Sequence, residues 1–363
     1  MRAAWKGTRI LKNPDVGRET SFSEPSAARP PRSSWLLRIP RALLRVVWFI
    51  VRALVVLWAT LVIYYSNLPW PWARIALAMV FAAFGVWALW SARRPRIGWL
   101  FAGVFLAVVA WYASIPPSHD RPWRPEVAVM PRAIIDGDRV KFTGYRHFDF
   151  RSASDFTPHY EEREVELSHL TGCDLIISYF MPGPVAHTFV SFTFDNALPV
   201  CISIETRPEV GEGFAPIASM FKQFELIYVV GDERDLIRLR SNFRGEEVFL
   251  YPIRMTPERA RDLFLVYLER INELADRPEW YHLLKNSCTI NIVRYANRAG
   301  REGGFDIRHL INGWADRYLY RAGLLESSLP FDELRRQSRI TDVSIAAGTG
   351  DDYSRKIRAD LPR

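Results

Sequence analysis

The stretch "HTFVSFTFDNALPVCISIE", residues 187–205, carries the clearest structural pattern in the C-terminal part of the chain. Mainly apolar residues alternate with mainly polar residues on both sides of Asn196, which is typical of two half-buried antiparallel strands. With Asn196 at the apex of a three-residue turn, His187 falls opposite Glu205. One face is then almost wholly apolar and is the predicted core face: Thr188, Val190, Phe192, Phe194, Val200, Ile202 and Ile204.

Similar strand-like runs precede and follow this hairpin, and two helical patterns come after them. The runs are "DRVKFTGYRHFDF", "CDLIISYF", "FELIYVV" and "EVFLYPI". A long amphipathic helix is predicted to begin with Thr256 as its cap, followed by Pro257 and Glu258. Its apolar stripe is Ala260, Leu263, Phe264, Tyr267, Leu268, Ile271 and Leu274. Strands followed by helices, without strict alternation, predict an α+β fold with an antiparallel sheet.

The second face of the hairpin carries the residues of chemical interest: His187, Phe189, Ser191, Thr193, Cys201, Ser203 and Glu205. On the predicted register, His187 and Glu205 are cross-strand neighbours with Cβ atoms within about 5 Å. A carboxylate at that distance fixes the tautomer of an imidazole and stabilises its protonated form. This is the role of the acidic residue in a constellation of nucleophile, base and acid.

The stretch "LLKNSCTINIVRYANRAG", residues 283–300, supplies a nucleophile for that base. Asn286 or Ser287 can cap a helix over the rest of the stretch, which places Cys288 in the first turn. There the helix dipole and unpaired N–H groups favour the thiolate and lower a pKa that is otherwise about 8.5. The same N–H groups, with Thr289 among them, can bind the oxyanion of a tetrahedral intermediate. Papain-like enzymes use such a thiol, at a helix start facing a sheet-borne His.

Each of these residues also has a purely structural interpretation, which the sequence leaves open. Cys288 can be a small buried hydrophobe. His187 can be a packed or surface residue at the start of a strand, and Glu205 a salt-bridge partner of Arg207 or of another base.

Other segments give weaker signals. Cys201 is a rival nucleophile, but in mid-strand it has no helix dipole to activate it, and a Cys173–Cys201 disulfide is a further alternative. The stretch "GDERDLIRLR", residues 231–240, is predicted to be a solvated, salt-bridged segment. The remaining histidines lack metal-ligand spacing and no phosphate-binding glycine loop is present, so no metal and no cofactor is predicted.

A membrane segment precedes this domain. No Asp or Glu occurs in residues 46–115. Three apolar runs there are each close to the roughly 20 residues that a helix needs to cross a bilayer: 46–65, 75–90 and 97–115. Tryptophans fall near the ends of these runs, as in the aromatic belt of a membrane protein: Trp70, Trp72, Trp90 and Trp99.

The positive charge is concentrated at the N-terminal end, although a formal net charge of +8 alone would fit a nucleic-acid-binding protein. Residues 1–45 carry +7 and residues 46–115 carry +5, which leaves −4 for the rest. This distribution argues against a nucleic-acid partner and follows the positive-inside rule. It predicts a cytoplasmic N-terminus in the inner membrane of a bacterium and a periplasmic location for the chain after the third span.

Four parts are therefore predicted. Residues 1–45 form a basic, disordered cytoplasmic leader, and residues 46–115 form three transmembrane helices. Residues 116–132 are a linker, and residues 133–363 are the periplasmic domain.

Several motifs in fixed order, between Asp155 and Leu325, resemble the Lnb N-terminal periplasmic domain family. Besides the two stretches above, they are "DFTPHYEEREVELSHLTGCDLIISYF", "FELIYVVGDERDLIRLR", "VFLYPI" and "GWADRYLYRAGLL". Named members of that family are bacterial lipoprotein N-acyltransferases, which move a fatty acyl chain from a phospholipid onto an amine. The resemblance implies a circularly permuted papain-like domain. It also implies that Cys288 is the nucleophile and His187 its base, with Glu205 at a recurrent acidic position.

The predicted function is accordingly that of a membrane-anchored periplasmic thiol acyltransferase, with a phospholipid as acyl donor and a lipoprotein or another amine as acceptor. The chain departs from that family because three spans precede its domain, so the substrate can differ while the chemistry is shared. Two alternatives stay open: a Cys-His amidase or peptidase acting on the cell wall or on peptides, and a non-catalytic periplasmic binding domain. A polar cleft beside Cys288 would favour the former, and a wide separation of Cys288 from His187 the latter.

Overall fold

The computed structural model describes residues 35–181, 183–213, 215–300, 312–325 and 328–362, with the backbone alone for residues 35–41. Three apolar helices come first: α1 (Trp35–Tyr64), α2 (Pro71–Val86, continued by the π-helical turn Trp87–Ser91) and α3 (Pro95–Ser114). Three segments of them are long and apolar enough to cross a membrane: Ala42–Tyr64, Pro71–Ser91 and Pro95–Ser114. The structure therefore has three helices capable of spanning a membrane at the three predicted places.

The N-terminal leader overlaps the first helix. Its residues 1–34 lie outside the described part of the chain, but α1 already begins at Trp35, before the expected start of the span at Val46. The end of the leader is therefore helical and not disordered. Leu36, Leu37 and the arginines are good helix formers, and the helix continues through Pro40 into the apolar segment that begins at Ala42.

The predicted linker packs against the domain for most of its length. His119 Nε2 lies 2.8 Å from the carbonyl oxygen of Leu274. The Arg207 guanidinium lies over the Trp123 ring, 4.2 Å from its centroid, and donates to the carbonyl oxygen of Val127 at 2.9 Å. Because these contacts hold it at several points, the segment is part of the domain rather than a free spacer.

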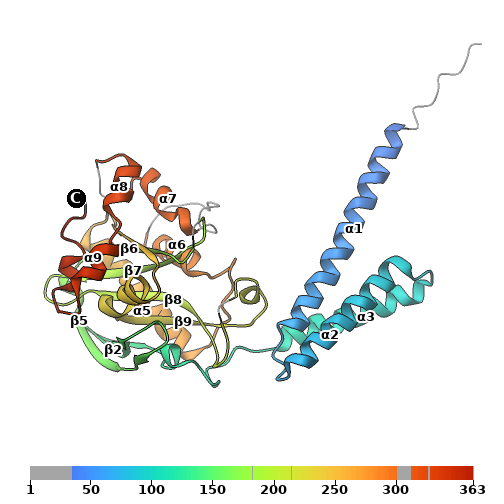
Figure 1. Ribbon diagram of the computed structural model, residues 1–363, viewed down its shortest axis with the longest axis horizontal. Coiled ribbons are helices and arrows are strands. Elements are labelled where there is room, and N and C mark those ends of the chain that lie inside the picture. The colour runs from blue at the N-terminus through green and yellow to red at the C-terminus, as the bar shows by residue number, and fades with distance from the viewer. Residues whose placement is uncertain (1–34, 182, 214, 301–311, 326–327, 363) are drawn as a thin grey trace, which may run out of the picture. The chain divides into compact units, whose positions relative to one another are not determined.

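The domain is built on an eight-stranded sheet in the order β1-β2-β9-β8-β7-β6-β10, with β5 paired to β2 (Figure 1). Neighbouring described strands are antiparallel, apart from the short parallel contact of β2 with β9. This confirms the predicted α+β fold with an antiparallel sheet. The strands are β1 (Arg132–Asp136), β2 (Arg139–Arg146), β5 (Tyr160–Glu166), β6 (Leu170–Tyr179), β7 (His187–Phe194), β8 (Val200–Arg207), β9 (Glu225–Asp232) and β10 (Glu247–Pro252). A separate ribbon pairs β3 (Asp149–Phe150) with β4 (Phe156–Thr157).

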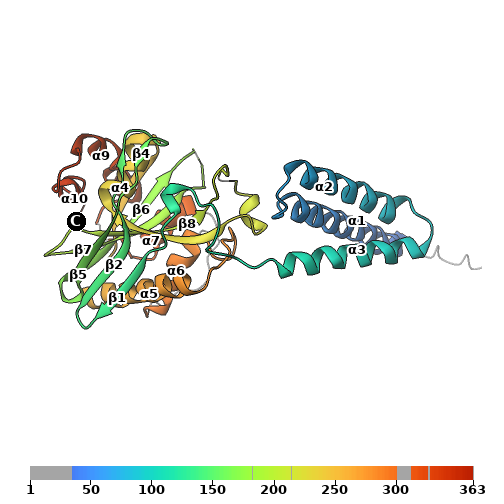
Figure 2. The same ribbon diagram turned by 90° about the horizontal axis from the view of Figure 1, so that it is seen from below.

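Helices cover both faces of the sheet (Figure 2). The first face carries α5 (Pro257–Asp276), α6 (Cys288–Arg298), α7 (Ala315–Arg321) and α8 (Phe331–Gln337). The second face carries α4 (Glu233–Arg238), a π-helical turn (Leu239–Phe243), α9 (Thr341–Ala347) and α10 (Tyr353–Lys356). The apolar stripe predicted for α5 is buried in full, and Thr256 caps this helix by accepting from the N–H of Arg259.

The hairpin of β7 and β8 has the predicted register. Val190 pairs with Ile202, and Phe192 pairs with Val200. The predicted core face packs against α5 and α6, whereas the second face is also buried, under α4 and α9. The ladder ends at Val190, so toward His187 the two strands are no longer paired with each other. This leaves room between their ends for side chains from other elements.

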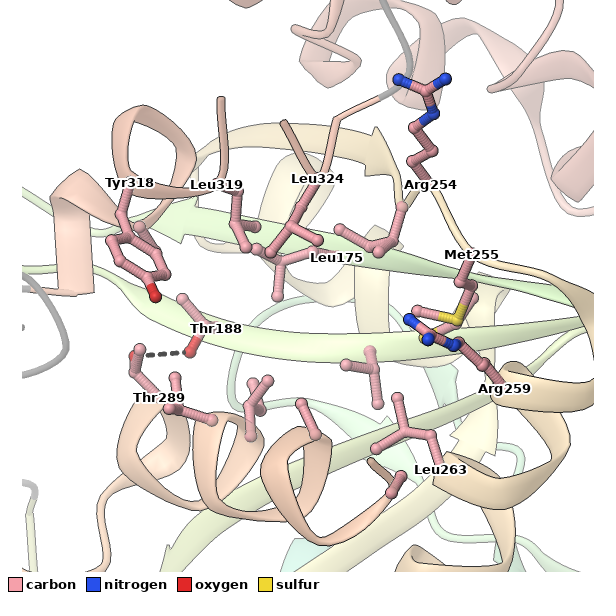
Figure 3. A pocket seen from close by; sticks show the side chains of 18 residues that line it. Leu175, Thr188, Arg254, Met255, Arg259, Leu263, Thr289, Tyr318, Leu319 and Leu324 are labelled. Atoms are coloured by element: carbon pink, nitrogen blue, oxygen red, sulfur yellow. Dashed lines mark hydrogen bonds between the residues drawn. The ribbon is translucent and has the colours of Figure 1, made fainter. Parts of the chain in front are cut away.

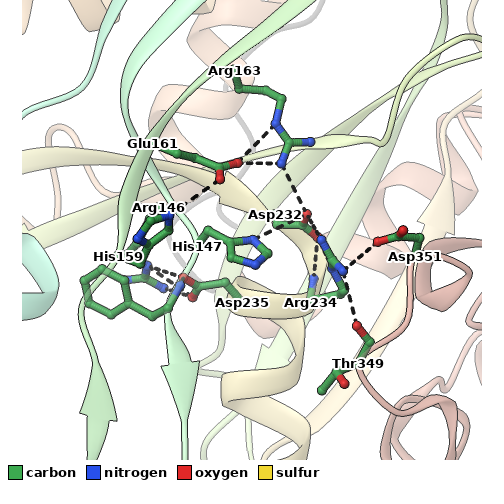
Figure 4. Close-up of polar contacts among 11 residues, drawn as sticks. Arg146, His147, His159, Glu161, Arg163, Asp232, Arg234, Asp235, Thr349 and Asp351 are labelled. Carbon is green, nitrogen blue, oxygen red and sulfur yellow. Dashed lines mark hydrogen bonds and ion pairs between the residues drawn. The ribbon is translucent and has the colours of Figure 1, made fainter.

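The stretch at residues 231–240 is buried, which corrects the prediction of a solvated segment. Asp232 and Asp235 are each 1% exposed. Arg146 donates to both carboxylate oxygens of Asp235, at 3.0 and 3.1 Å from Nε, and Asp232 caps α4 by accepting from the N–H of Arg234 (Figure 4). The segment is buried because β9 is an inner strand and α4 packs on the second face of the sheet. The paired arginines offset the cost of removing the carboxylates from water.

Candidate active site

His187 and Glu205, which the hairpin pattern predicted to be neighbours, are connected through a third residue. His187 Nε2 lies 2.7 Å from Ser203 Oγ, which in turn donates to Glu205 Oε1 at 2.7 Å. The direct distance from Nε2 to Oε1 is 3.8 Å. The predicted pair is therefore brought together, with the Ser203 hydroxyl as the bridge between imidazole and carboxylate.

Arg240 is a neighbour of this pair that the sequence pattern did not reveal. Its guanidinium donates to Glu205 Oε1 at 2.8 Å and lies over the Phe189 ring, 4.6 Å from the ring centroid. His187 stacks on the same Phe189 ring, with a centroid distance of 5.6 Å. Burial would raise the pKa of the Glu205 carboxyl, but the charges of Arg240 and His187 hold it below its usual range. Glu205 thus pairs with Arg240, a base other than Arg207, so the salt bridge that the structural alternative expected is present beside the contact with His187.

Cys288 is the first residue of α6, as predicted, and its side chain is buried. Burial alone would raise the pKa of its thiol. The charge of His187, together with hydrogen bonds from His187 and from Thr188, outweighs burial and lowers that pKa to about 6. The lowered pKa favours the thiolate, which is the form of cysteine that acts as a nucleophile.

A side-chain amide from a distant segment also faces the thiol. Asn312 Nδ2 lies 3.8 Å from Cys288 Sγ. The same side chain is fixed by its Oδ1, which accepts from the N–H of Ala186 at 2.9 Å. Asn312 stands beside the sequence motif "GWADRYLYRAGLL", but no spacing rule connected it with Cys288.

The Asn-Ser pair before Cys288 does not cap α6 in the predicted manner. Ser287 holds the N-cap position, but its side chain makes no capping hydrogen bond with any residue that the structure describes. Asn286 instead accepts from the N–H of His282 at 2.6 Å and donates to the carbonyl oxygen of Trp280 at 2.8 Å. It closes the loop ahead of the helix, and this loop sets the position of Cys288.

The other two cysteines are poor nucleophiles. Cys173 and Cys201 are free, buried thiols. They lie on opposite faces of the sheet, because Cys173 pairs with Phe192 and Cys201 with the adjacent Ser191. A disulfide between them is excluded by this placement. Burial raises the pKa of both thiols well above its usual value. In the described part of the chain, no group of three or more His, Cys, Asp or Glu side chains is placed to hold a metal ion.

Cys288 and His187 line one cleft of about 260 Å³. Charged side chains make up much of its wall: Arg124, Glu126, Glu205, Arg240, Arg244 and Glu246. Apolar side chains, among them Phe180, Val185 and Leu283, complete the wall, and the linker contributes Arg124, Glu126 and Val127 to it.

A second pocket, of about 140 Å³, lies behind the two candidate catalytic residues. Thr188 follows His187 and Thr289 follows Cys288, and the two hydroxyls form a hydrogen bond of 2.8 Å at one end of this pocket (Figure 3). Arg254 and Arg259 stand toward the other end. The wall between is mainly aliphatic: Leu175, Val190, Leu263, Ile292, Val293, Ala296, Leu319 and Leu324.

The fold and the site define a membrane protein whose α+β domain presents a thiol beside an imidazole. Residues 156–313 match the family model of the Lnb N-terminal periplasmic domain, which confirms the family that the motifs predicted. The match covers less than half of the chain and leaves out the three apolar helices. Comparisons with curated proteins and with solved structures gave no match. The chain is thus a membrane-anchored protein with a periplasmic domain, while a permuted papain-like topology stays a prediction.

Proposed function

We propose that the protein is a thiol acyltransferase of the bacterial inner membrane, with its N-terminus in the cytoplasm. The observation that carries this proposal is the apolar pocket directly behind the pair of Cys288 and His187. Cys288, whose thiol has a pKa of about 6, lines the neighbouring cleft, and the hydrogen-bonded hydroxyls of Thr188 and Thr289 lie between the catalytic pair and this pocket. An aliphatic wall of this kind suits a fatty acyl chain, because burial of each methylene contributes about 0.8 kcal/mol.

In the first half of the reaction, the Cys288 thiolate attacks the ester carbonyl carbon of a phospholipid. A C–S bond forms and the C–O bond to the glycerol oxygen breaks, and the leaving alkoxide takes its proton from the His187 imidazolium. Because Nε2 is engaged by Ser203, Nδ1 is the nitrogen that can serve the thiol. The N–H of Cys288 and the Asn312 amide are suitable donors for the oxyanion.

In the second half, an amine attacks the thioester. His187 takes a proton from the amine, a C–N bond forms, and the C–S bond breaks to restore the thiolate. Glu205 and Arg240 would hold the Ser203 hydroxyl in place during both steps, and Ser203 would in turn orient His187. A lipoprotein N-terminus is the acceptor that the family resemblance implies. The apolar anchor would raise the effective concentration of lipid substrates, since enzyme and substrate share one membrane.

A hydrolase that cuts amide bonds is the second candidate, and the polar wall of the cleft favours it. Arg124, Glu126 and Arg244 would suit a peptide or cell-wall substrate. In this reaction the acyl-enzyme would be released by water and would need no apolar pocket. The apolar pocket behind Thr188 and Thr289 is the reason for preferring acyl transfer.

The test is to incubate the purified full chain with a phospholipid that carries a labelled acyl chain and to search for a labelled thioester by mass spectrometry. We expect the label on Cys288, and its loss in Cys288→Ala and His187→Ala. Release of the label by water alone, without an added amine, would support the hydrolase. No adduct on a folded wild-type protein would contradict acyl transfer.

A further inference from the structure

Five large apolar side chains are exposed on three loops of the domain: Phe180 (42%), Met181 (53%), Val185 (42%), Leu284 (49%) and Trp314 (47%). We call this set the apolar rim. Exposed clusters of large apolar residues are uncommon on soluble surfaces and mark contacts with proteins or membranes.

The three loops gather at the mouth of the cleft that holds Cys288. Phe180 and Val185 line this cleft directly, and so does Leu283, the neighbour of Leu284. The loop of Trp314 is fixed to the first loop, because the N–H of Gly313 donates to the carbonyl oxygen of Pro184 at 2.8 Å. A Cβ atom at Gly313 would lie 2.6 Å from the same carbonyl group, so the close approach requires glycine.

The charge of the rim suits a membrane surface. The three segments that form it, residues 179–186, 280–287 and 312–314, contain no Asp or Glu. Lys285 lies directly after Leu284 and can meet anionic headgroups, which attract basic side chains next to apolar ones.

The chain keeps the start of the domain close to the end of the third apolar helix. The third apolar helix ends at Ser114, and His119 is already bound to the domain. Five residues span at most about 18 Å. Arg121 lies over the ring of Trp280, 5.4 Å from its centroid, and Trp280 begins the loop that carries Leu284. The first residues of the domain after the third helix therefore contact the loop that carries Leu284.

From these observations we propose that the apolar rim docks on the periplasmic surface of the membrane that holds the three helices. Its apolar side chains would enter the headgroup region around the mouth of the cleft. The purpose of this docking rests on the proposed function, because an acyl chain could then pass from the bilayer to the cleft without crossing water.

The position of the rim can be measured with spin labels on the full chain. The label is placed at Leu284→Cys in a Cys288→Ala background, since Cys173 and Cys201 are buried. The protein is reconstituted in nanodiscs of phosphatidylethanolamine and phosphatidylglycerol, and the accessibility of the label to oxygen and to a water-soluble nickel complex is compared. A label at Ile345→Cys is the matched control, because Ile345 is 52% exposed but lies on α9, over the second face of the sheet.

We expect high oxygen and low nickel accessibility at position 284, and the reverse at position 345. If the label at position 284 were as accessible to the nickel complex as the label at position 345, both positions would lie in water and the proposal would be overturned. Low accessibility to both reagents at position 284 would also overturn it, because a protein and not lipid would then cover the rim. Acyl transfer is absent in this background, so the result does not depend on the proposed chemistry.

Kinetics give a second measurement. We expect the pair Met181→Ser and Leu284→Ser to raise KM for phospholipid in vesicles about tenfold, since burial of two apolar side chains is lost. In this double variant, a soluble reagent should alkylate Cys288 at the wild-type rate, which would show that the site is intact. The control variant Ile345→Ser should change neither KM nor the alkylation rate. An unchanged KM in the pair variant would contradict docking.

Discussion

His187 Nε2 lies 3.8 Å from Glu205 Oε1, and the Ser203 hydroxyl spans this gap with a 2.7 Å hydrogen bond on each side. The orientation of the imidazole therefore depends on a residue between the predicted base and the predicted acid. Because Ser203 touches neither the thiol nor its substrate in the proposed reaction, it is a positioning residue.

We expect Ser203→Ala to reduce kcat about fivefold, because the hydrogen bond between His187 and Ser203 contributes roughly 1 kcal/mol. KM should stay nearly constant, since the loss affects proton transfer and not binding. Steady-state turnover of labelled phospholipid measures both values. Ser191→Ala is the matched control, because Ser191 is buried in the same hairpin but donates to Glu233. Equal losses in the two variants would indicate a general packing defect.

The reactivity of Cys288 should follow a low pKa. With a thiol pKa of about 6, the thiolate fraction rises through pH 6, so alkylation by iodoacetamide should reach half its maximal rate there and level off above pH 7. His187→Ala should move the midpoint upward, because burial remains while the stabilising charge is lost. Mass spectrometry of the alkylated peptide measures the rate at each pH. A wild-type midpoint near the ordinary value of about 8.5 would refute the thiolate–imidazolium pair.

Filling the apolar pocket should discriminate between long and short acyl chains. Ala296 lines this pocket from α6, and Ala296→Phe adds a large ring to it. We expect transfer of a long acyl chain to fall at least about tenfold, whereas a short-chain ester should react as before. Ala346→Phe, at an exposed position of α9, serves as the control. Equal rates for both chain lengths in Ala296→Phe would place the acyl chain elsewhere.

Glu225 should make the domain less stable as the pH rises. Burial raises the pKa of its carboxyl to about 7, despite the opposing charge of Arg121, while an unfolded Glu titrates at about 4.3. Between these values the folded state binds the proton and the unfolded state does not, so the free energy of unfolding decreases with pH. The decrease amounts to at most about 4 kcal/mol.

Glu225→Gln should weaken this dependence. Thermal unfolding of the full chain in detergent, at pH 5 and at pH 8, gives the comparison. We expect the midpoint of the wild-type protein to fall between the two conditions by more than that of the variant. Parallel behaviour of the two proteins would assign the pH dependence to other groups.

The positions of those site residues that follow a strand or helix pattern could be predicted from the sequence. Alternation placed His187 and Glu205 on one side of the hairpin, and helix-start signals placed Cys288 in the first turn of α6. Arg240 and Asn312 could not be predicted, because each reaches the site through tertiary packing that leaves no local pattern. The charges around Arg240 also resemble those of a solvated helix, and only the inner position of β9 makes them buried.

The site is assembled from segments that lie far apart along the chain. When the chain is exported, His187 on β7 precedes Cys288, and Asn312 emerges later still. The low pKa of the thiol requires contact with His187 and Thr188, so an unfolded chain carries an ordinary, slowly reacting cysteine. In the proposed mechanism, Cys288 would therefore become a reactive nucleophile only after β7 and α6 have packed together.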